Sequence, residues 1–336
     1  MEEGMTNKRM TFVGAITSAV FCSLIPLTAT AQDWPAQPIQ IVVPYSAGGA
    51  VDVLTRIIGK EMSKDLGQPI IVQPRPGGEG NIAAMAVAKA KPDGYTLLSS
   101  SAVLTSIPIL FDDIEWSADD FAPIGRFATS SGFIVSSAKL PVKSIPELIA
   151  YVKENPGLPS AVLIGGAFTT IVTRMLAKEA GINLLFVPYQ GAAQHMTDLY
   201  EGRVSLATVS GNLACGAIND NKLNVLAVTG DERSSQAPDI PTTKEAGIPE
   251  INTQGWYGLH APAGTPPDRV AKLAQSLENA LKKDSVRQAL SKACVNVAYQ
   301  NPEELANFVK EDIKHWEKAV ALMKSQEKKA PTVPKK

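Results

Sequence analysis

Histidine and cysteine are scarce in this chain, with three of each among 336 residues. His195, His260 and His315 are isolated, and the sequence has neither an HExxH motif nor closely paired cysteines, so the common zinc signatures are absent. Cys215 and Cys294 are the only cysteines beyond the first 31 residues. Because one pair cannot make a disulfide scaffold, we expect two buried thiols and no bound metal.

Strong net charge and common catalytic motifs are missing as well. Lys and Arg number 32 against 33 Asp and Glu, and this balance argues against a nucleic-acid partner. Ser46 and Ser210 lie near glycines, but neither occupies a G-x-S-x-G elbow. The turn at Gly48 and Gly49 lacks both G-x-G-x-x-G and the G-K-[ST] ending of a P-loop. We therefore assign no catalytic residue and expect no cofactor, although triads without local motifs occur on unrelated folds.

The N-terminus has the pattern of a secretory signal. Lys8 and Arg9 precede an apolar run at 12–27 that is too short for a comfortable membrane span, and an A-x-A cleavage site follows at 29–31. We expect residues 1–31 to be removed and the mature protein to act outside the cytoplasm, with an uncleaved anchor as the alternative.

A strand, a glycine turn and a helix are predicted between residues 39 and 66. The β-branched run at 39–43 suits a buried parallel strand, which Pro44 ends. Beyond the turn, apolar residues at spacings of three and four predict an amphipathic helix that stops at Gly67.

The glycine turn is a candidate anion site. Gly48 and Gly49 have no Cβ, so unpaired amides at the helix start can face a ligand, and the positive end of the helix dipole favours a carboxylate or phosphate there. The alternative is an ordinary βα turn in which Asp52 serves only as a helix-start carboxylate.

The alternation of strands and helices continues through residue 131 and restarts near Gly132, where a short strand is predicted at 133–135. Repeated crossovers of this length imply parallel strands flanked by helices, with ligands beyond the carboxyl ends of the strands. The glycine turn and the serines after the strand at 95–98 lie at that edge. The C-terminal part is predicted to be helical, with a docking helix that starts at Asn301.

Nine ordered stretches carry a family resemblance over residues 34 to about 321: WPAQPIQIVVPYSAGGAVD, GQPIIVQPRPGGEGNIAA, KPDGYTLL, DDFAPIGR, LPVKSIPELIAYVKENPG, VPYQGAAQHMTDLYEGRV, KLNVLAVTGDERS, DIPTTKEAGIP and WYGLHAPAGTPPDRVAKL. The chain resembles the tripartite tricarboxylate transporter substrate-binding family, also called the Bordetella uptake gene family. The resemblance implies a monomeric periplasmic binding protein with an α/β fold of Venus-flytrap form. Each of its two domains would be a mainly parallel sheet flanked by helices.

On this resemblance we expect one domain at 32–131 plus 231–325, a second at 132–230, and a disordered tail at 326–336. A small organic acid would bind in the cleft, and a membrane transporter or sensor kinase would read the closed state. Two alternatives stay open: a two-lobed hydrolase that uses Asp52 or a serine from 99–101, and a structural or adhesive envelope protein.

The resemblance also implies the ligand site. The family loop P-F-x-P-G-G-x-x-D is matched by Pro44, Gly48, Gly49 and Asp52, with Tyr45 for Phe, and its amides would hold a ligand carboxylate. The full set of expected ligand contacts is Ala47, Gly48, Gly49, Val51, Asp52, Ser100, Ser101, Gly166, Phe168, Thr169, Tyr189, Gly191 and Asn212.

Departures from the family pattern predict a less polar pocket than usual. Ala47 stands where Pro is usual and Val51 where Thr is common, Ile171 replaces the customary histidine, and Phe168 is larger than the usual residue. An apolar wall would leave a second carboxylate unpaired, at a cost of several kcal/mol. We therefore expect an acid with an apolar or aromatic body rather than citrate.

Overall fold

The computed structural model describes residues 34–163, 167–189, 192–218, 222–230, 232–234, 237–251 and 253–327, so the expected signal at 1–31 lies outside them. The strands are β1 (Ile39–Val43), β2 (Ile70–Pro74), β3 (Thr96–Ser100), β4 (Phe121–Ser137), β5 (Leu158–Leu163), β6 (Leu184–Tyr189), β7 (Leu206–Ser210), β8 (Leu223–Val228), β9 (Gln254–Pro262) and β10 (Asn296–Gln300). The α-helices are α1 (Ala50–Leu66), α2 (Asn81–Ala88), α3 (Val103–Leu110), α4 (Ile145–Glu154), α5 (Ala167–Glu179), α6 (Ala192–Glu201), α7 (Gly211–Ile218), α8 (Pro267–Leu281), α9 (Asp284–Lys292) and α10 (Pro302–Glu327).

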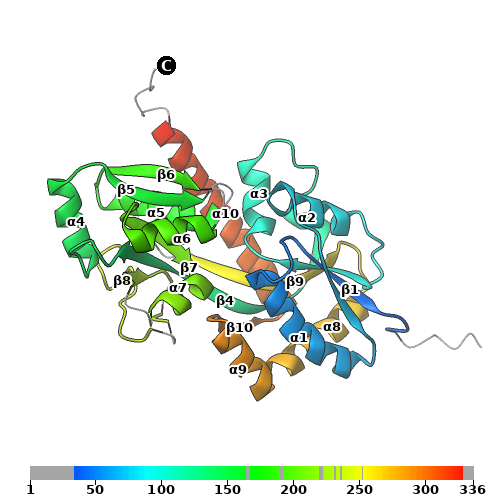
Figure 1. The fold of residues 1–336 in the computed structure, drawn as a ribbon. Coiled ribbons are helices and arrows are strands. Elements are labelled where there is room, and N and C mark those ends of the chain that lie inside the picture. The colour runs from blue at the N-terminus through cyan, green and yellow to red at the C-terminus, as the bar shows by residue number, and fades with distance from the viewer. Residues whose placement is uncertain are drawn as a thin grey trace, which may run out of the picture. The chain divides into compact units, whose positions relative to one another are not determined.

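The strands form a curled sheet in the order β2-β1-β3-β9-β4-β7-β5-β6, and β8 and β10 also pair with β4 (Figure 1). β1 runs parallel to β2 and β3, and β5 runs parallel to β6 and β7, as βα crossovers require. Helices pack on the part of the sheet formed by β1, β2 and β3 and on the part formed by β5, β6 and β7 (Figure 1). The predicted α/β fold is therefore confirmed, but the sheet is mixed rather than mainly parallel, because the five pairings that involve β4 or β9 are antiparallel.

β4 is much longer than the sequence predicted, with 17 residues instead of the expected three at 133–135. Its first part, up to Ser131, pairs with β9, whereas residues from Gly132 onward pair with β7 and β8. Register shifts at Pro123–Gly125 and at Arg126–Ala128 show where the ladder is irregular. The expected domain boundary at Gly132 lies where β4 changes partners, and the division into two domains stays a prediction.

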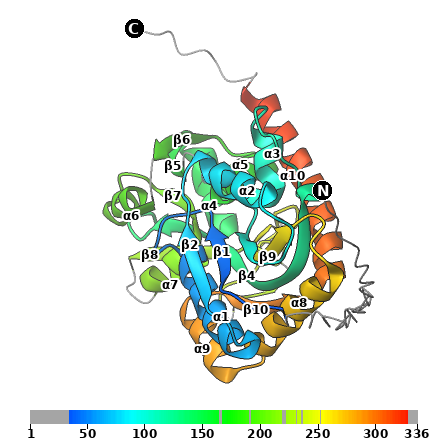
Figure 2. The same ribbon diagram turned by 90° about the vertical axis from the view of Figure 1, so that its right-hand side faces the viewer.

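α10 packs along α3, β4 and α5, as Figures 1 and 2 show. Asn301 and Glu304 cap its start reciprocally, because each backbone amide donates to the other residue's side-chain oxygen at 2.9–3.0 Å. Trp316 is buried against Ile171 of α5, so the docking helix also contacts α5, which packs on β5 and β7. The helix continues to Glu327, so the expected tail at 326–336 begins inside it, and residues 328–336 lie outside the described part.

The expectation of two buried thiols is wrong. Cys215 of α7 and Cys294, in the turn between α9 and β10, form a disulfide and are both partly exposed. A Cβ at Gly211, the first residue of α7, would lie 2.8 Å from the Cys294 carbonyl oxygen, so this glycine allows the close approach. Cysteines 79 residues apart are brought together by tertiary packing that no local pattern indicates.

Within the described residues, no helix combines the length and apolar character needed to cross a membrane.

Candidate functional site

The predicted glycine turn connects β1 to α1 at the carboxyl end of the strand. Gly48 has φ +79°, a region that favours glycine, and Gly49 caps the helix with an extended backbone. The Val53 amide makes the first bond of the helix, to the Gly49 carbonyl at 3.0 Å. The amides of Ala50 and Val51 precede that bond, so they belong to the unpaired first turn that can receive an anion.

Asp52 organises this turn from within. Its side chain is buried, accepts the Gly48 amide at 3.0 Å, and accepts two bonds from the Arg56 guanidinium at 2.9 Å. The Arg56 bonds, helped by the Gly48 amide, hold the pKa of Asp52 below its ordinary value, with desolvation acting in the opposite direction. Its observed contacts are those of a helix-start carboxylate.

This arrangement predicts a pH-dependent stability. Because folding lowers the pKa of Asp52, its contribution is present above the ordinary carboxyl pKa of about 4 and is lost as pH falls through the folded pKa. Asp52→Asn should therefore lower the free energy of unfolding at pH 7 by about 1–3 kcal/mol, and the difference should shrink at pH 3. Urea unfolding at both pH values measures this.

The matched control is Asp113→Asn, which removes one exposed carboxylate that has no hydrogen bond or ion pair with another described residue and should change little at either pH. An Asp52→Asn effect of equal size at pH 7 and pH 3 would contradict the proposed electrostatic origin.

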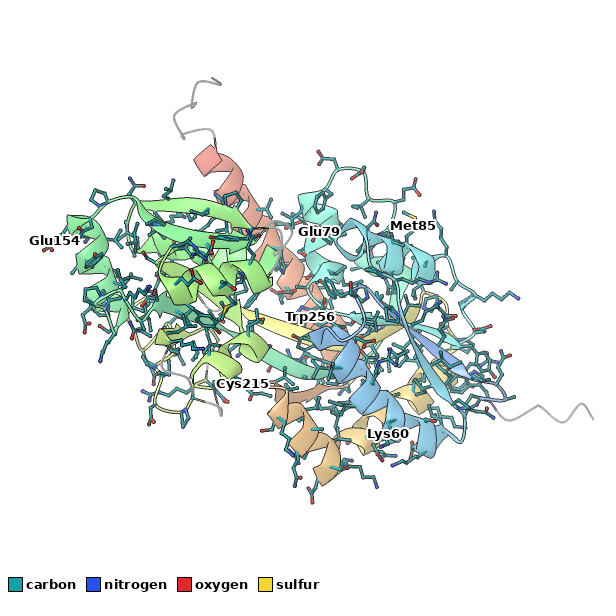
Figure 3. The ribbon with its side chains drawn as sticks, viewed as in Figure 1. Lys60, Glu79, Met85, Glu154, Cys215 and Trp256 are labelled. Carbon is teal, nitrogen blue, oxygen red and sulfur yellow. A yellow bond between two sulfur atoms is a disulfide. The ribbon has the colours of Figure 1, made fainter. Side chains whose placement is uncertain are left out.

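A cavity of about 370 Å³ lies beside the start of α1. One wall comes from the β1–α1 turn, the loop before α2 and the start of α3, the opposite wall from α5 and the end of β7, and the floor from β9. The lining residues are Tyr45, Gly49, Ala50, Val51, Glu79, Ser101, Ala102, Val103, Ser106, Ile107, Phe168, Thr169, Ser210, Gly255, Trp256 and Tyr257. Of these, Figure 3 labels Glu79 and Trp256, both near the middle of the molecule.

The cavity contains some of the expected contacts. Gly49, Val51, Ser101, Phe168 and Thr169 line it. Ala47, Gly48, Asp52, Ser100 and Tyr189 do not, Gly166 and Gly191 lie outside the described residues, and of Asn212 only the backbone is described.

Two of the expected contacts use their polar atoms elsewhere. The Ser100 hydroxyl lies 2.7 Å from Nδ1 of His260, a buried ring whose pKa desolvation lowers to about 3. The Tyr189 phenol donates to Asp198 at 2.7 Å, and burial together with that bond raises its pKa to about 12. Neither side chain is therefore available to the cavity in this structure.

Ser101 supplies a polar group to the cavity. Its side chain is 7% exposed, and its hydroxyl has no hydrogen-bond partner among the described residues. The nearby Tyr45 phenol has its pKa raised to about 12, mainly by desolvation, which the Ser101 hydroxyl partly offsets. A buried hydroxyl with an unused donor favours a polar ligand atom at this position.

Aromatic residues form much of the lining, and Phe168 is the one among Phe168, Trp256 and Tyr257 that the sequence places in the site. Trp256 is fixed by its indole N–H, which donates to Asp312 at 3.0 Å, and Tyr257 stacks on Phe127. The Phe168 ring fits over Gly132, where a Cβ would approach it to 3.1 Å. Their joint placement depends on β9 crossing beneath the two walls, which no local pattern predicts.

One premise of the pocket prediction needs correction. Ile171, which replaces the customary histidine, is buried against Trp316 and does not line the cavity. Phe168 does line it, so the apolar character expected of this wall rests on Phe168 alone.

Known proteins are similar to this chain in sequence and in fold. A family described as tripartite tricarboxylate transporter family receptor matches residues 54–324. The chain belongs to this receptor family. Protein BugT of Bordetella pertussis is 31% identical over 87% of this chain and 91% of its own length. MatC from Rhodopseudomonas palustris, solved with bound malate, is 31% identical, covers 85% of this chain and 99% of its own, and superposes with a TM-score of 0.73. A second R. palustris protein, solved with adipate, has 30% identity, coverages of 86% and 98%, and a TM-score of 0.77.

The family and its solved members are substrate-binding receptors, so this chain is a receptor rather than an enzyme. The structure adds nothing that favours a metal: within the described residues, no group of three His, Cys, Asp or Glu side chains is placed to hold one.

Proposed function

We propose that this receptor captures a small organic carboxylate in the cavity beside α1 and presents it to a membrane transporter or sensor kinase. The observation that carries the proposal is the meeting of the unpaired first turn of α1 with the buried Ser101 hydroxyl in one cavity. The protein would be exported by its N-terminal signal and would act in the periplasm as a monomer.

The ligand carboxylate would lie at the start of α1. The amides of Ala50 and Val51 and the hydroxyl of Ser101 would donate to it, since all three residues line the cavity. Malate and adipate, bound by two solved relatives, are both carboxylic acids, which supports the same ligand class here. Family pattern alone adds Gly166, Gly191 and Asn212 as contacts from the opposite side.

Binding would be coupled to closure of the proposed domains, 32–131 with 231–325 against 132–230. Both proposed domains line the cavity. Thr169 and Ser210 belong to the second domain, and the start of α1 belongs to the first. A ligand shifts such an equilibrium only through contacts that are better in the closed state, and a ligand touching both walls meets that condition.

The body of the ligand would be apolar or aromatic. Val103, Ile107, Phe168 and Trp256 line the cavity, and Glu79 is also part of the lining. A second carboxylate would meet apolar walls and a like charge, both unfavourable. Monocarboxylates should therefore bind better than citrate.

Thermal unfolding tests the proposal. The protein from residue 32 onward, refolded to remove carried-over ligand, is heated with aliphatic and aromatic mono-, di- and tricarboxylates. A monocarboxylate at about one hundred times its Kd should add about 2.7 kcal/mol to the free energy of unfolding. No stabilisation by any carboxylate would refute the receptor site, and citrate as the strongest ligand would refute the pocket character.

A further inference from the structure

The cavity has a negative charge on its wall and no positive charge among its described lining residues. Glu79 is that charge, and neither Lys nor Arg lines the cavity with it. No ion pair or hydrogen bond joins its carboxylate to another described residue. Tyr45 shares this lining, and desolvation raises the pKa of its phenol to about 12 with only a minor contribution from the charge of Glu79. An acid-binding cavity thus carries an uncompensated carboxylate.

The backbone conformation at Glu79 indicates that its side chain has a role. Glu79 has φ +56° and ψ +23°, and Gly77, Gly78 and Gly80 around it also have positive φ. Glycine adopts this conformation with less strain than glutamate, so the carboxylate is what residue 79 adds to the loop. A Cβ at Gly80 would approach Pro44 and Val103 to 3.0 Å, so the loop is packed tightly against the cavity wall.

The other large groups on the lining are aromatic. Tyr45, Phe168, Trp256 and Tyr257 share the cavity with Glu79. Trp256 is held from behind by Asp312, which also accepts the Thr105 hydroxyl at 2.6 Å. Aromatic faces combined with a carboxylate attract cations, and they suit an alkylated ammonium in particular because it needs no hydrogen-bond acceptors.

We propose that the ligand is a zwitterion: a carboxylate that also carries an N-alkylated cationic nitrogen, held between Glu79 and the aromatic residues. The inference rests on the proposed carboxylate site at the start of α1 and adds a second, oppositely charged subsite at Glu79, on the same wall of the cavity. The proposed ligand class is the betaine-like acids. With such a ligand, the Glu79 carboxylate, which has no ion partner in the cavity wall, would pair with the cationic nitrogen.

Matched ligand pairs test this inference by calorimetry. Trimethylammonio carboxylates with one to four methylene groups are compared with their tert-butyl isosteres, which keep the shape and carboxylate but lack the positive charge. For the best chain length, the zwitterion should bind the full-length mature protein at least tenfold more tightly than its isostere. Glu79→Gln should reduce that ratio several-fold, to the part that the aromatic faces supply, while leaving the affinity for the isostere unchanged or improved.

Two further variants separate charge recognition from folding. Glu79→Gly relieves the positive φ, so it should keep or raise the melting temperature and still reduce the preference for the zwitterion as much as Glu79→Gln does. Glu154→Gln, an exposed carboxylate at the outer end of α4 in Figure 3, should leave the ratio unchanged. A wild-type ratio of one or less, or a ratio that Glu79→Gln leaves at its wild-type value, would overturn the inference. If other carboxylic acids bind but no trimethylammonio carboxylate or tert-butyl isostere does, the zwitterion inference fails and the proposed carboxylate site stands. If no carboxylate binds at all, both the zwitterion inference and the proposed function fail.

Discussion

Replacing Gly49 with valine should abolish carboxylate binding, with an affinity loss of at least about 100-fold, or 2.7 kcal/mol. Gly49 lines the cavity and caps α1 at φ −70° and ψ 166°, a conformation open to any L residue. A Cβ there would lie 3.2 Å from the Ser46 carbonyl oxygen, a tight contact that a shift of a few tenths of an ångström relieves, and valine adds its bulk at the residue just before the amides of Ala50 and Val51. The variant should therefore fold and yet exclude the ligand from those amides.

Two controls make the result specific. Gly49→Ala adds only the Cβ and should lose less affinity than Gly49→Val. Gly216→Val adds the same side chain to α7 where nothing lies within 4 Å, so its affinity should match the wild type. Calorimetry with the tightest acid from the carboxylate panel gives the affinities, and thermal unfolding checks that each variant is folded. Wild-type affinity in a folded Gly49→Val protein would refute carboxylate binding at the start of α1.

The sequence predicts this turn well because its signals are local. The β-branched run of β1, the two glycines and the apolar stripe of α1 all lie within one stretch of the chain, and each reflects backbone sterics or helical periodicity. The first part of β4 gives no such signal. Its Pro123, Gly125 and serines 130–131 resemble a loop, and only pairing with β9 makes the segment a strand.

The site shows the same limit at the scale of single residues. Ser100 and Ser101 were both expected to face the ligand, but neighbouring residues at a strand end point in opposite directions, and Ser100 contacts His260 instead. Glu79 lies in a glycine loop recognised as a turn, yet its place in the cavity depends on how that loop packs on α3. Trp256 lies near the start of β9, and only the antiparallel pairing of β9 with β3 brings that start to the carboxyl end of β3, where the ligand contacts are expected.

The disulfide was missed for the same reason, and its removal is expected to have the largest effect on stability. Cys215→Ser combined with Cys294→Ser should lower the free energy of unfolding by about 2–4 kcal/mol, because the bond closes a long loop and restricts the unfolded chain. The two cysteines are separated by 79 residues in the sequence, so the loop is long. Urea unfolding under oxidising conditions measures the difference.

Reduction of the wild type supplies the matched comparison. A reducing agent should bring its unfolding midpoint to that of the double variant, and the double variant should not respond to the reagent. In addition, the bond joins α7, in the proposed domain 132–230, to the turn before β10 in the other proposed domain. During the proposed domain closure the disulfide would keep Cys215 and Cys294 together, so the hinge of that closure would lie near them. An unchanged midpoint in the double variant would show that the packing of α7 against the Cys294 turn holds these segments without the covalent bond.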